Sequence, residues 1–294
     1  EPKLKQKTTE LFWAPSEKAF LAAFGQWRET YSQGIRPRTD LFIKNPIPYG
    51  VMGFPGGMLN GLIGQAIMVG MACLVGIPLG ILTGIYLSEY EANSWLARPV
   101  RFVSDVLAGV PSIVVGVLGY ELLVVPFSSG EFLGMELPFL QTLGIRGTNG
   151  YAGAAALAFI MIPIVSRTTE EMLRLVPNSY REASVALGAT KARTILRVVL
   201  PAATGSVITG IMLAMARIAG ETAPLLFTAL ASSYTETNPK HPFPSLTVQI
   251  YQAAMDVYPE RHRQAQFGIL VLLVIIFVLN LAIRYFAYRV RKIK

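Results

Sequence analysis

Long stretches without a charged residue restrict the fold of this chain more than any other feature. Asp, Glu, Lys and Arg are all missing from residues 45–88, 147–166, 198–216 and 264–283. Each stretch holds about 20 or more mostly apolar residues, enough for a helix to cross a hydrocarbon core roughly 30 Å thick. Charged residues make up only 15% of the chain, against about 25% in soluble domains. The pattern predicts a polytopic membrane protein built from helices.

We expect five membrane-spanning helices in an all-α bundle. Their expected bounds are 58–87, 103–127, 150–172, 199–220 and 264–287. The second span is the weakest, because Asp105 and Glu121 fall near its two ends. Each of the first four contains a proline, which membrane helices tolerate and which often kinks them.

Three glycines lie at four-residue spacing in the first expected span. Gly76, Gly80 and Gly84 fall on one face of a helix, because residues four apart are neighbours on its surface. In a membrane, a face of small residues lets another helix approach closely. We therefore interpret the three glycines as a helix-packing surface.

The distribution of Lys and Arg sets the expected orientation. These residues gather after the third span and after the fifth, as Arg167, Arg174, Arg181, Lys191, Arg193 and Arg197, and as Arg284, Arg289, Arg291, Lys292 and Lys294. By the positive-inside rule, the loop 173–198 and the C-terminus lie in the cytoplasm, and residues 233–263 form a loop outside. The net charge of +8 lies between and beyond the spans, so we expect no nucleic-acid partner.

The residue types that bind metals are sparse. His241 and His262 lie far apart in the expected outer loop, and we interpret them as solvated residues, since a metal site needs several ligands together. Cys73 is the single cysteine and lies inside an apolar segment, so it forms no disulfide within the chain. We expect no metal site.

The first 57 residues fit the five-span pattern less well. Residues 1–10 are basic and look cytoplasmic, whereas five spans with a cytoplasmic C-terminus place residues 30–57 outside. Charges interrupt residues 11–34, so this segment is either an amphipathic helix on the membrane surface over Leu11 to Trp27 or an altered first span. We expect residues 1–57 to form this N-terminal part and residues 58–294 to form the membrane domain.

Residues 180–197 predict two short helices joined by a turn. Ser179 is a candidate N-cap, and Glu182 three residues later would complete a capping box. Gly188 is expected to end the first helix. The second short helix leads to Pro201, where the fourth span begins. A simple connecting loop is the alternative interpretation.

This segment resembles the EAA loop of ABC importer permeases. The residues that carry the resemblance are Glu182, Ala183, Ala186, Gly188 and Pro201. The resemblance implies a type I importer (MetI-like) fold of five core spans plus an N-terminal helix. It also implies that the first short helix docks into a groove on an ATPase subunit, with small residues allowing close contact and the glutamate making a polar contact.

The chain has no Gly-x-x-x-x-Gly-Lys-Ser/Thr phosphate-binding loop. Such a loop supplies the backbone amides and the lysine that cradle the phosphates of ATP. We therefore expect ATP and Mg²⁺ to be used by a partner ATPase, with no cofactor bound by this chain and no enzymatic activity of its own.

Arg217 and Glu221 are charged residues at the end of the fourth span. They lie four residues apart, so they share one helix face. A charge deep in a span costs about 2.5–3.5 kcal/mol on insertion scales, and such residues commonly mark ion or substrate pathways. Either the two form a structural ion pair, or Arg217 attracts an anion in an aqueous path while Glu221 orients it. A guanidinium presents a planar fork that suits tetrahedral oxyanions.

The surrounding sequence resembles the phosphate-specific permeases of the PstA type. Ala216 to Leu230 carries the resemblance most closely, and 167–173, 57–60 and 85–90 add to it, so that it covers roughly 40–290. It implies that Arg167, Arg217 and Glu221 act in phosphate movement, with Thr222 beside them on the substrate path. For Arg167, an ordinary positive-inside arginine is the other interpretation. The chain departs from the family pattern before residue 40.

The resemblance implies the membrane-spanning subunit of an ATP-driven phosphate importer in a bacterial inner membrane. Its expected partners are a second, related permease, two ATP-binding cassette subunits, an extracytoplasmic phosphate-binding protein and the membrane lipid. Alternating access would move the anion. Another oxyanion such as molybdate or sulfate is an alternative cargo. A stand-alone channel or secondary transporter is a further alternative, although no expected span holds an acidic cluster.

Overall fold

The computed structural model describes residues 58–292 except 91–94, 96, 130, 133–134, 137–146, 231, 233–235, 237 and 258. Both interpretations of 11–34 and the boundary at residue 57 therefore lie outside the described residues and stay predictions. The described elements before the centre of the chain are α4 (Leu59–Ile85), the π-helix η1 (Tyr86–Tyr90), α5 (Ala97–Gly109), α6 (Ser112–Gly119), the π-helix η2 (Tyr120–Val124), α7 (Val125–Ser129), β1 (Glu131–Phe132) and β2 (Met135–Glu136).

The second half of the chain is helical throughout its described elements. They are α9 (Gly150–Arg174), α10 (Asn178–Ala186), α11 (Lys191–Thr194), the π-helix η3 (Ile195–Val199), α12 (Leu200–Ala219), α13 (Ala223–Thr228), α14 (Leu246–Ala254) and α15 (Pro259–Lys292). The two short strands pair as one antiparallel hairpin, with Glu131 opposite Glu136. The expected all-α class is confirmed.

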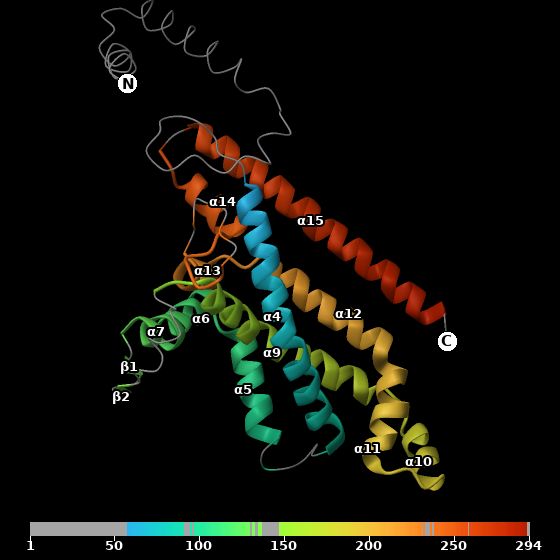
Figure 1. Ribbon diagram of the computed structural model, residues 1–294. Helices are drawn as coiled ribbons and strands as arrows, with labels where there is room; N and C mark the ends of the chain where they lie inside the picture. The colour runs from blue at the N-terminus through green and yellow to red at the C-terminus, as the bar shows by residue number, and fades with distance from the viewer. Residues whose placement is uncertain are drawn as a thin grey trace, which may run out of the picture. The chain divides into compact units, whose positions relative to one another are not determined.

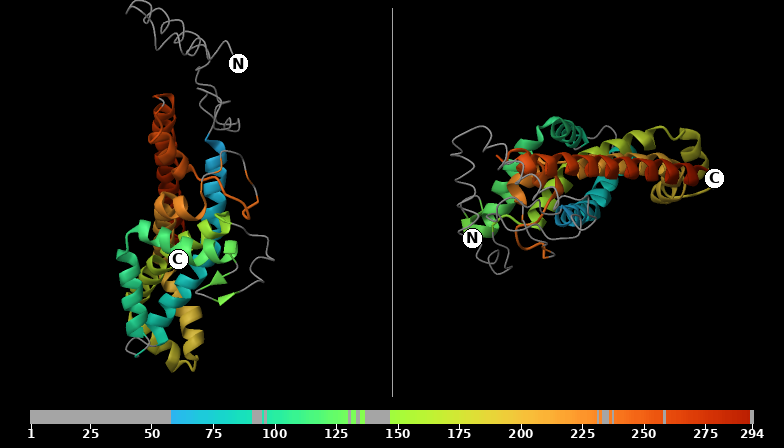
Figure 2. Two further views of the ribbon diagram at one scale, coloured as in Figure 1. Left: turned by 90° about the vertical axis from the view of Figure 1, so that its left-hand side faces the viewer. Right: turned by 90° about the horizontal axis from the view of Figure 1, so that it is seen from above.

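Four described helical segments are long and apolar enough to cross a membrane. They are Leu59–Tyr90, Gly150–Arg174, Lys191–Ala219 and Gln264–Ala282. They match the first, third, fourth and fifth expected spans. Helices α10 and α11 lie at the end of the bundle where α4 and α9 finish and α12 begins, and α14 lies near the start of α4 (Figures 1 and 2). We call these the α10 end and the α14 end.

The second expected span is not one continuous helix. Ala97–Leu107 and Ser112–Val124 meet at a bend of 107°, which lies at the proline expected to kink this span. Helix α5 ends at Gly109, and Pro111 has an extended ψ of 132°. Proline has no N–H to donate and its ring clashes with the preceding turn, which explains the break. Counted as one broken span, this pair gives up to five spans in the described part of the chain.

The three expected packing glycines lie against α9. A Cβ added at Gly80 would come within 2.6 Å of the Val165 Cβ, and one added at Gly84 within 2.6 Å of the Thr169 Cβ. Four residues earlier on both helices, Gly76 lies against Met161. Both helices therefore run in the same direction with matched four-residue steps. This glycine seam confirms the helix-packing interpretation and allows the close approach that drives helix association in membranes.

The expected outer loop is partly a packed helical segment. Within it, α14 covers Leu246–Ala254, and Phe243, Leu246 and Val248 are fully buried. The backbone is held by the Phe243 amide, which donates to the Ala229 carbonyl at 3.0 Å. The expected loop over 233–263 is therefore helical, not loop, at Leu246–Ala254. His241 and His262 are both exposed.

Candidate substrate path and coupling surface

The end of α12 forms a tight turn that places the predicted path residues. The amides of Gly220 and Glu221 donate to the carbonyls of Arg217 and Ile218 at 3.1 and 3.2 Å. Helix α13 starts two residues later, with Pro224 in its first turn, where a missing N–H costs no hydrogen bond. Arg217 therefore lies in the last turn of α12, and Glu221 lies in the turn itself.

Arg217 and Glu221 form a loose ion pair. The Arg217 Nε lies 3.7 Å from the Glu221 Oε1, and the side chains are 55% and 15% exposed. Among the described residues, this is the one charged contact of Arg217. Because the contact is long and the guanidinium has five N–H groups, donors remain available for an oxyanion.

Thr222 begins α13 beside this pair. Its carbonyl accepts from the Leu226 amide at 3.0 Å, and its side chain, which is half-buried, makes no capping hydrogen bond to α13. The structure thus brings Thr222, Glu221 and Arg217 together in one turn.

A buried polar network holds this turn, and the sequence analysis missed it. The Gln65 Nε2 donates to the Ala219 carbonyl at 3.2 Å, and the Ser245 hydroxyl donates to the Gln65 Oε1 at 2.6 Å. The Thr247 hydroxyl donates to the Glu221 carbonyl at 3.0 Å and lies 3.0 Å from the Ser245 oxygen. Helix α4 therefore holds the end of α12 at Ala219, and α14 holds the Glu221 backbone. Gln65 is a polar residue inside an uncharged span, and that was the signal that could have pointed to it.

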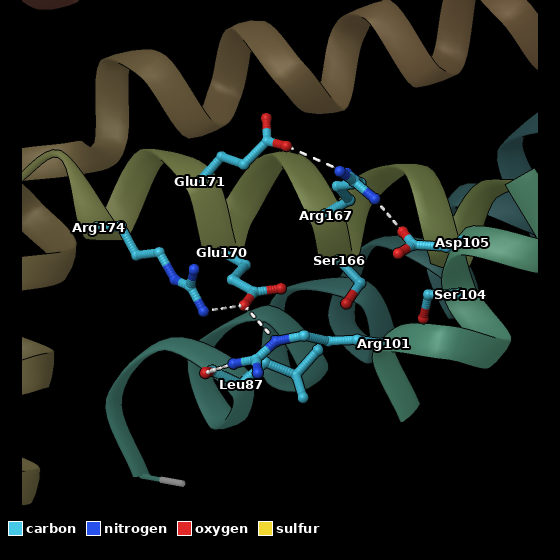
Figure 3. Close-up of a pocket in the computed structure, with 9 residues that line it drawn as sticks. All are labelled: Leu87, Arg101, Ser104, Asp105, Ser166, Arg167, Glu170, Glu171 and Arg174. Atoms are coloured by element: carbon cyan, nitrogen blue, oxygen red, sulfur yellow. Dashed lines mark hydrogen bonds and ion pairs between the residues drawn. The ribbon is translucent and has the colours of Figure 1, made fainter. Parts of the chain in front are cut away.

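Arg167 lies near the α10 end of α9. Its guanidinium pairs with Asp105 of α5 and with Glu171, the latter at 3.1 Å, and its side chain is half exposed. Next to it, Glu170 accepts from Arg101 at 2.7 Å and from Arg174 at 2.6 Å. Figure 3 shows these charged side chains around a small cavity between α5 and α9.

The cavity is lined by charged residues, two serines and one leucine. Its volume is about 140 Å³, and it is lined by Leu87, Arg101, Ser104, Asp105, Ser166, Arg167, Glu170, Glu171 and Arg174. The Ser166 hydroxyl is buried and has no hydrogen-bond partner among the described residues. Three arginines face three carboxylates here, so the cavity is close to neutral, and its arginines mainly join α9 to α5 and η1.

The structure does not bring Arg167 and Arg217 to one place. A Cβ at Gly210 of α12 would lie 2.8 Å from the Thr168 Cβ, so Gly210 marks the level of Arg167 on α12. Arg217 lies about two helical turns further along α12, which is roughly 10 Å along its axis. The predicted path residues therefore occupy two levels of the bundle.

Helix α10 forms the expected first short helix, but its start differs from the prediction. It begins at Asn178 after Pro177, and no side chain caps it, so the capping box of Ser179 and Glu182 was wrong. The reason is that Pro177, with an extended ψ of 140°, starts the helix before Ser179 is reached. The Glu182 side chain is consequently exposed.

The turn after α10 is a Schellman motif. The amides of Gly188 and Ala189 donate to the carbonyls of Val185 and Ser184 at 2.8 and 3.1 Å. Gly188 has a φ of +81°, a conformation that favours glycine, and this confirms its predicted role in ending the helix. Thr190 then caps α11 through the Arg193 amide.

The outer face of α10 exposes apolar and small side chains. Leu187 is 89% exposed, and Tyr180 and Val185 are exposed with it. The residues of the expected docking motif on this face, Glu182, Ala183, Ala186 and Gly188, are exposed too. We call this set, Tyr180, Glu182, Ala183, Val185, Ala186, Leu187 and Gly188, the α10 face.

Comparison with known proteins agrees with this geometry. The family model of binding-protein-dependent transport system inner membrane components matches residues 76–292. Solved structures of ABC importers share the fold. One is the inward-facing MetNI methionine ABC transporter, with a TM-score of 0.57 and 18% identity over 80% of this chain and 94% of that one. A bacterial ABC transporter that imports the polysaccharide alginate gives a TM-score of 0.59 at 14% identity, covering 98% and 99%.

The fold and the family model thus define a membrane component of a binding-protein-dependent transport system. The phosphate transport system permease protein PstA of Yersinia pestis is 42% identical over 78% of this chain and 72% of its own length. PstA 1 of Mycobacterium tuberculosis is 36% identical over 82% and 73%. The probable PstA of Methanocaldococcus jannaschii is 36% identical over 78% and 75%. The chain belongs to this family of inner membrane transport components, in its PstA group.

Proposed function

We propose that this chain is the membrane-spanning subunit of an ATP-driven phosphate importer and forms part of the path for the anion. The observation that carries the proposal is Arg217. It lies at the end of an uncharged span, is more than half exposed and has one loose contact with Glu221. The resemblance to PstA permeases at about 40% identity supports phosphate as the cargo.

Arg217 supplies a transient positive site. Its guanidinium donates two parallel hydrogen bonds to a phosphate oxygen pair, while Glu221 and Thr222 bound the site. Glu221 also limits how tightly the anion is held, since conduction needs binding that is weak enough for release. Arg167 lies about two turns nearer the α10 end and offers the anion a second, already paired cation on its way.

The α10 face couples the chain to an ATPase. Its exposed Leu187, Val185 and small residues fit an apolar groove, and the exposed Glu182 carboxylate is placed for a polar contact at the rim. ATP and Mg²⁺ are used by that partner, and this chain binds no cofactor and performs no covalent chemistry. Two ATP-binding cassette subunits, a related second permease and an extracytoplasmic phosphate-binding protein complete the assembly.

The importer works by alternating access in a bacterial inner membrane. The α10 end faces the cytoplasm together with the C-terminus, as the excess of Lys and Arg in these segments favours. The binding protein delivers phosphate at the α14 end. Closure of the ATPase pair then moves α10, and the spans rock so that the Arg217 site opens to the cytoplasm.

Uptake of radiolabelled phosphate tests the proposal. Assembled complexes are reconstituted in vesicles with ATP on the ATPase side and binding protein on the other side. Arg217→Gln is expected to lower uptake at least about tenfold, because hydrogen bonds to a charged group are lost. Arg98→Gln, an exposed arginine of α5, is the matched control. Wild-type uptake by assembled Arg217→Gln complexes would reject a substrate role for this arginine.

Two further arms separate the alternative functions. Excess molybdate or sulfate added with labelled phosphate leaves uptake unchanged if phosphate is the cargo, and suppresses it if another oxyanion is preferred. Vesicles that contain the permease subunits without ATPase show no uptake if the chain is a subunit of a pump. Uptake in these vesicles would instead indicate a stand-alone channel or secondary transporter.

A further inference from the structure

Arg181 differs from the exposed residues of the α10 face, because its side chain is only 22% exposed and its guanidinium reaches the bundle. Its guanidinium binds Glu89 of η1 in a two-point arrangement, with Nη2 at 2.5 Å from Oε1 and Nε at 3.1 Å from Oε2. The Glu89 side chain is only 7% exposed. A fork-to-carboxylate pair of this kind fixes the relative orientation of the two groups as well as their distance. Hydrogen bonding to Glu89 raises the pKa of Arg181, so the guanidinium stays charged.

The same side chain also closes the end of α9. The Arg181 Nη1 donates to the Val176 carbonyl at 2.6 Å, and Nη2 donates to the Leu173 carbonyl at 2.9 Å. The Leu173 carbonyl already accepts from the Val176 amide at 3.2 Å, so the arginine adds a side-chain donor to the turn that ends α9. One arginine thus joins three elements: α10, the end of α9, and η1, which continues α4.

Helix α11 is also connected to η1, through a separate contact. The Lys191 Nζ lies 5.1 Å from the centre of the Tyr90 ring, within range of a cation–π interaction. The buried hydroxyls of Ser184 and Thr194 lie 2.8 Å apart and join α10 to α11. Both short helices are therefore attached to neighbouring residues of η1, Glu89 and Tyr90.

Apolar packing holds the spans together at the α10 end. The residues of the α10 face take no part in this packing. At the α10 end, Leu173, Val176, Val199, Ala203 and Val207 form one buried cluster, and Ile85 of α4 packs against it. Helix α10 lies between Pro177 and Gly188, both suited to a change of chain direction. Without a side-chain connection, a force on α10 would bend these two joints and leave the spans in place.

We infer that the Arg181–Glu89 pair transmits the movement of α10 to the ends of α4 and α9, and that α10, α11 and η1 move as one rigid body throughout the transport cycle. The inference rests on the proposed function, because it requires an ATPase that moves α10. Arg181 acts here as a positioning residue, since it reaches the cargo only through the spans that it holds.

The number of phosphate ions moved per ATP hydrolysed tests the inference. Arg181→Lys keeps the charge but loses the fork, and Glu89→Gln keeps the shape but loses the charge. In assembled complexes both are expected to hydrolyse ATP while this ratio falls roughly two- to thirtyfold, the range for changes along a coupling element. Arg197→Lys, an exposed arginine of η3, is the matched control and keeps the wild-type ratio. A wild-type ratio in both pair variants would overturn the inference.

A covalent bridge separates transmission from a general loss of structure. Glu89→Cys and Arg181→Cys are combined in a Cys73→Ser background, which removes the single native cysteine. The reduced double variant is expected to be uncoupled, and a short thiol crosslinker between the two cysteines is expected to restore the ratio. A bridged protein as uncoupled as the reduced one, or one whose transport stops because the contact must open, would contradict a rigid connection.

The wild-type complex distinguishes a failure of this inference from a failure of the proposed function. If wild-type complexes couple phosphate uptake to ATP hydrolysis and the pair variants do so equally well, the inference alone fails. If wild-type complexes show no ATP-dependent phosphate uptake, the proposed function fails first.

Discussion

Arg181 and Arg217 are the same kind of side chain at opposite ends of the bundle, yet their surroundings differ. Arg181 donates to both oxygens of a buried carboxylate and to two helix-end carbonyls. Arg217 has a single ion pair at 3.7 Å within the described residues, and more than half of its side chain is exposed. The N–H groups of Arg181 already have acceptors, whereas N–H groups of Arg217 remain available for a ligand.

The difference teaches how to separate a charge that joins structural elements from a charge that can bind a ligand. A buried charge is expensive unless it is paired and hydrogen-bonded, so a fully satisfied arginine is explained by the fold. A loosely paired arginine at the end of an uncharged span has no such explanation and is the better candidate for a ligand site. Four predictions test this comparison.

The largest effect is expected at the Arg181–Glu89 pair. Glu89→Leu leaves Arg181 without its carboxylate and is expected to lower the free energy of unfolding by about 3 kcal/mol. Arg181→Leu, and both changes together, complete a double-mutant cycle measured by denaturation in detergent. A coupling energy near zero would remove the distinction between the two arginines.

Gln65→Leu is expected to cost about 2 kcal/mol, because the Ala219 carbonyl and the Ser245 hydroxyl both lose a buried partner. The loss should loosen the turn that carries Glu221 and therefore reduce phosphate uptake as well as stability. Gln266→Leu, at an exposed glutamine of α15, is the matched control. If Gln65→Leu unfolds like the wild type, the buried network does not hold the turn.

Gly188→Ala is expected to cost about 1 kcal/mol, since an L-residue is strained at a positive φ. Gly70→Ala provides the control, because an added Cβ meets nothing within 4 Å at either glycine but only Gly188 has a positive φ. Thermal unfolding of the two variants should therefore separate by sign, with Gly70→Ala slightly stabilising as expected in a helix. Equal shifts would mean that the α10 turn does not depend on its backbone conformation.

The smallest effect is expected at Arg217 and Glu221. A double-mutant cycle with Arg217→Gln and Glu221→Gln should give a coupling energy of about 0.4 kcal/mol, because the contact is long and residues four apart typically gain about this much. Added salt should reduce it further, because exposed charges are screened. A coupling energy comparable to that of the Arg181–Glu89 pair would favour the structural ion-pair interpretation of Arg217.

Much of the fold followed from residue type and spacing alone. The uncharged stretches predicted α4, α9, α12 and α15 within a few residues, because membrane thickness fixes the length of an apolar helix. The glycines of α4 predicted the packing with α9. Gly188 predicted the turn after α10. These are local or periodic signals, which a sequence displays directly.

The missed features depend on contacts between distant segments. Hydropathy does not register the size of the 107° bend at Pro111, because it averages over the two halves of the broken span. Helix α14 lies in a segment rich in polar residues and becomes buried only when Phe243 and its neighbours pack on α4 and α9. The network of Gln65, Ser245 and Thr247 joins residues about 180 positions apart. The transport roles of Arg167, Arg217, Glu221 and Thr222 stay predictions.

The glycine seam between α4 and α9 also provides a fixed reference distance, against which the movement of other helices can be measured. With Val165 and Thr169 filling the space above Gly80 and Gly84, the helices cannot slide by one residue without a collision. A pair of spectroscopic labels placed across the seam should therefore report one unchanging separation. Labels from α4 to α15 or to α6 would then read the transport movement against a stationary origin inside the same chain.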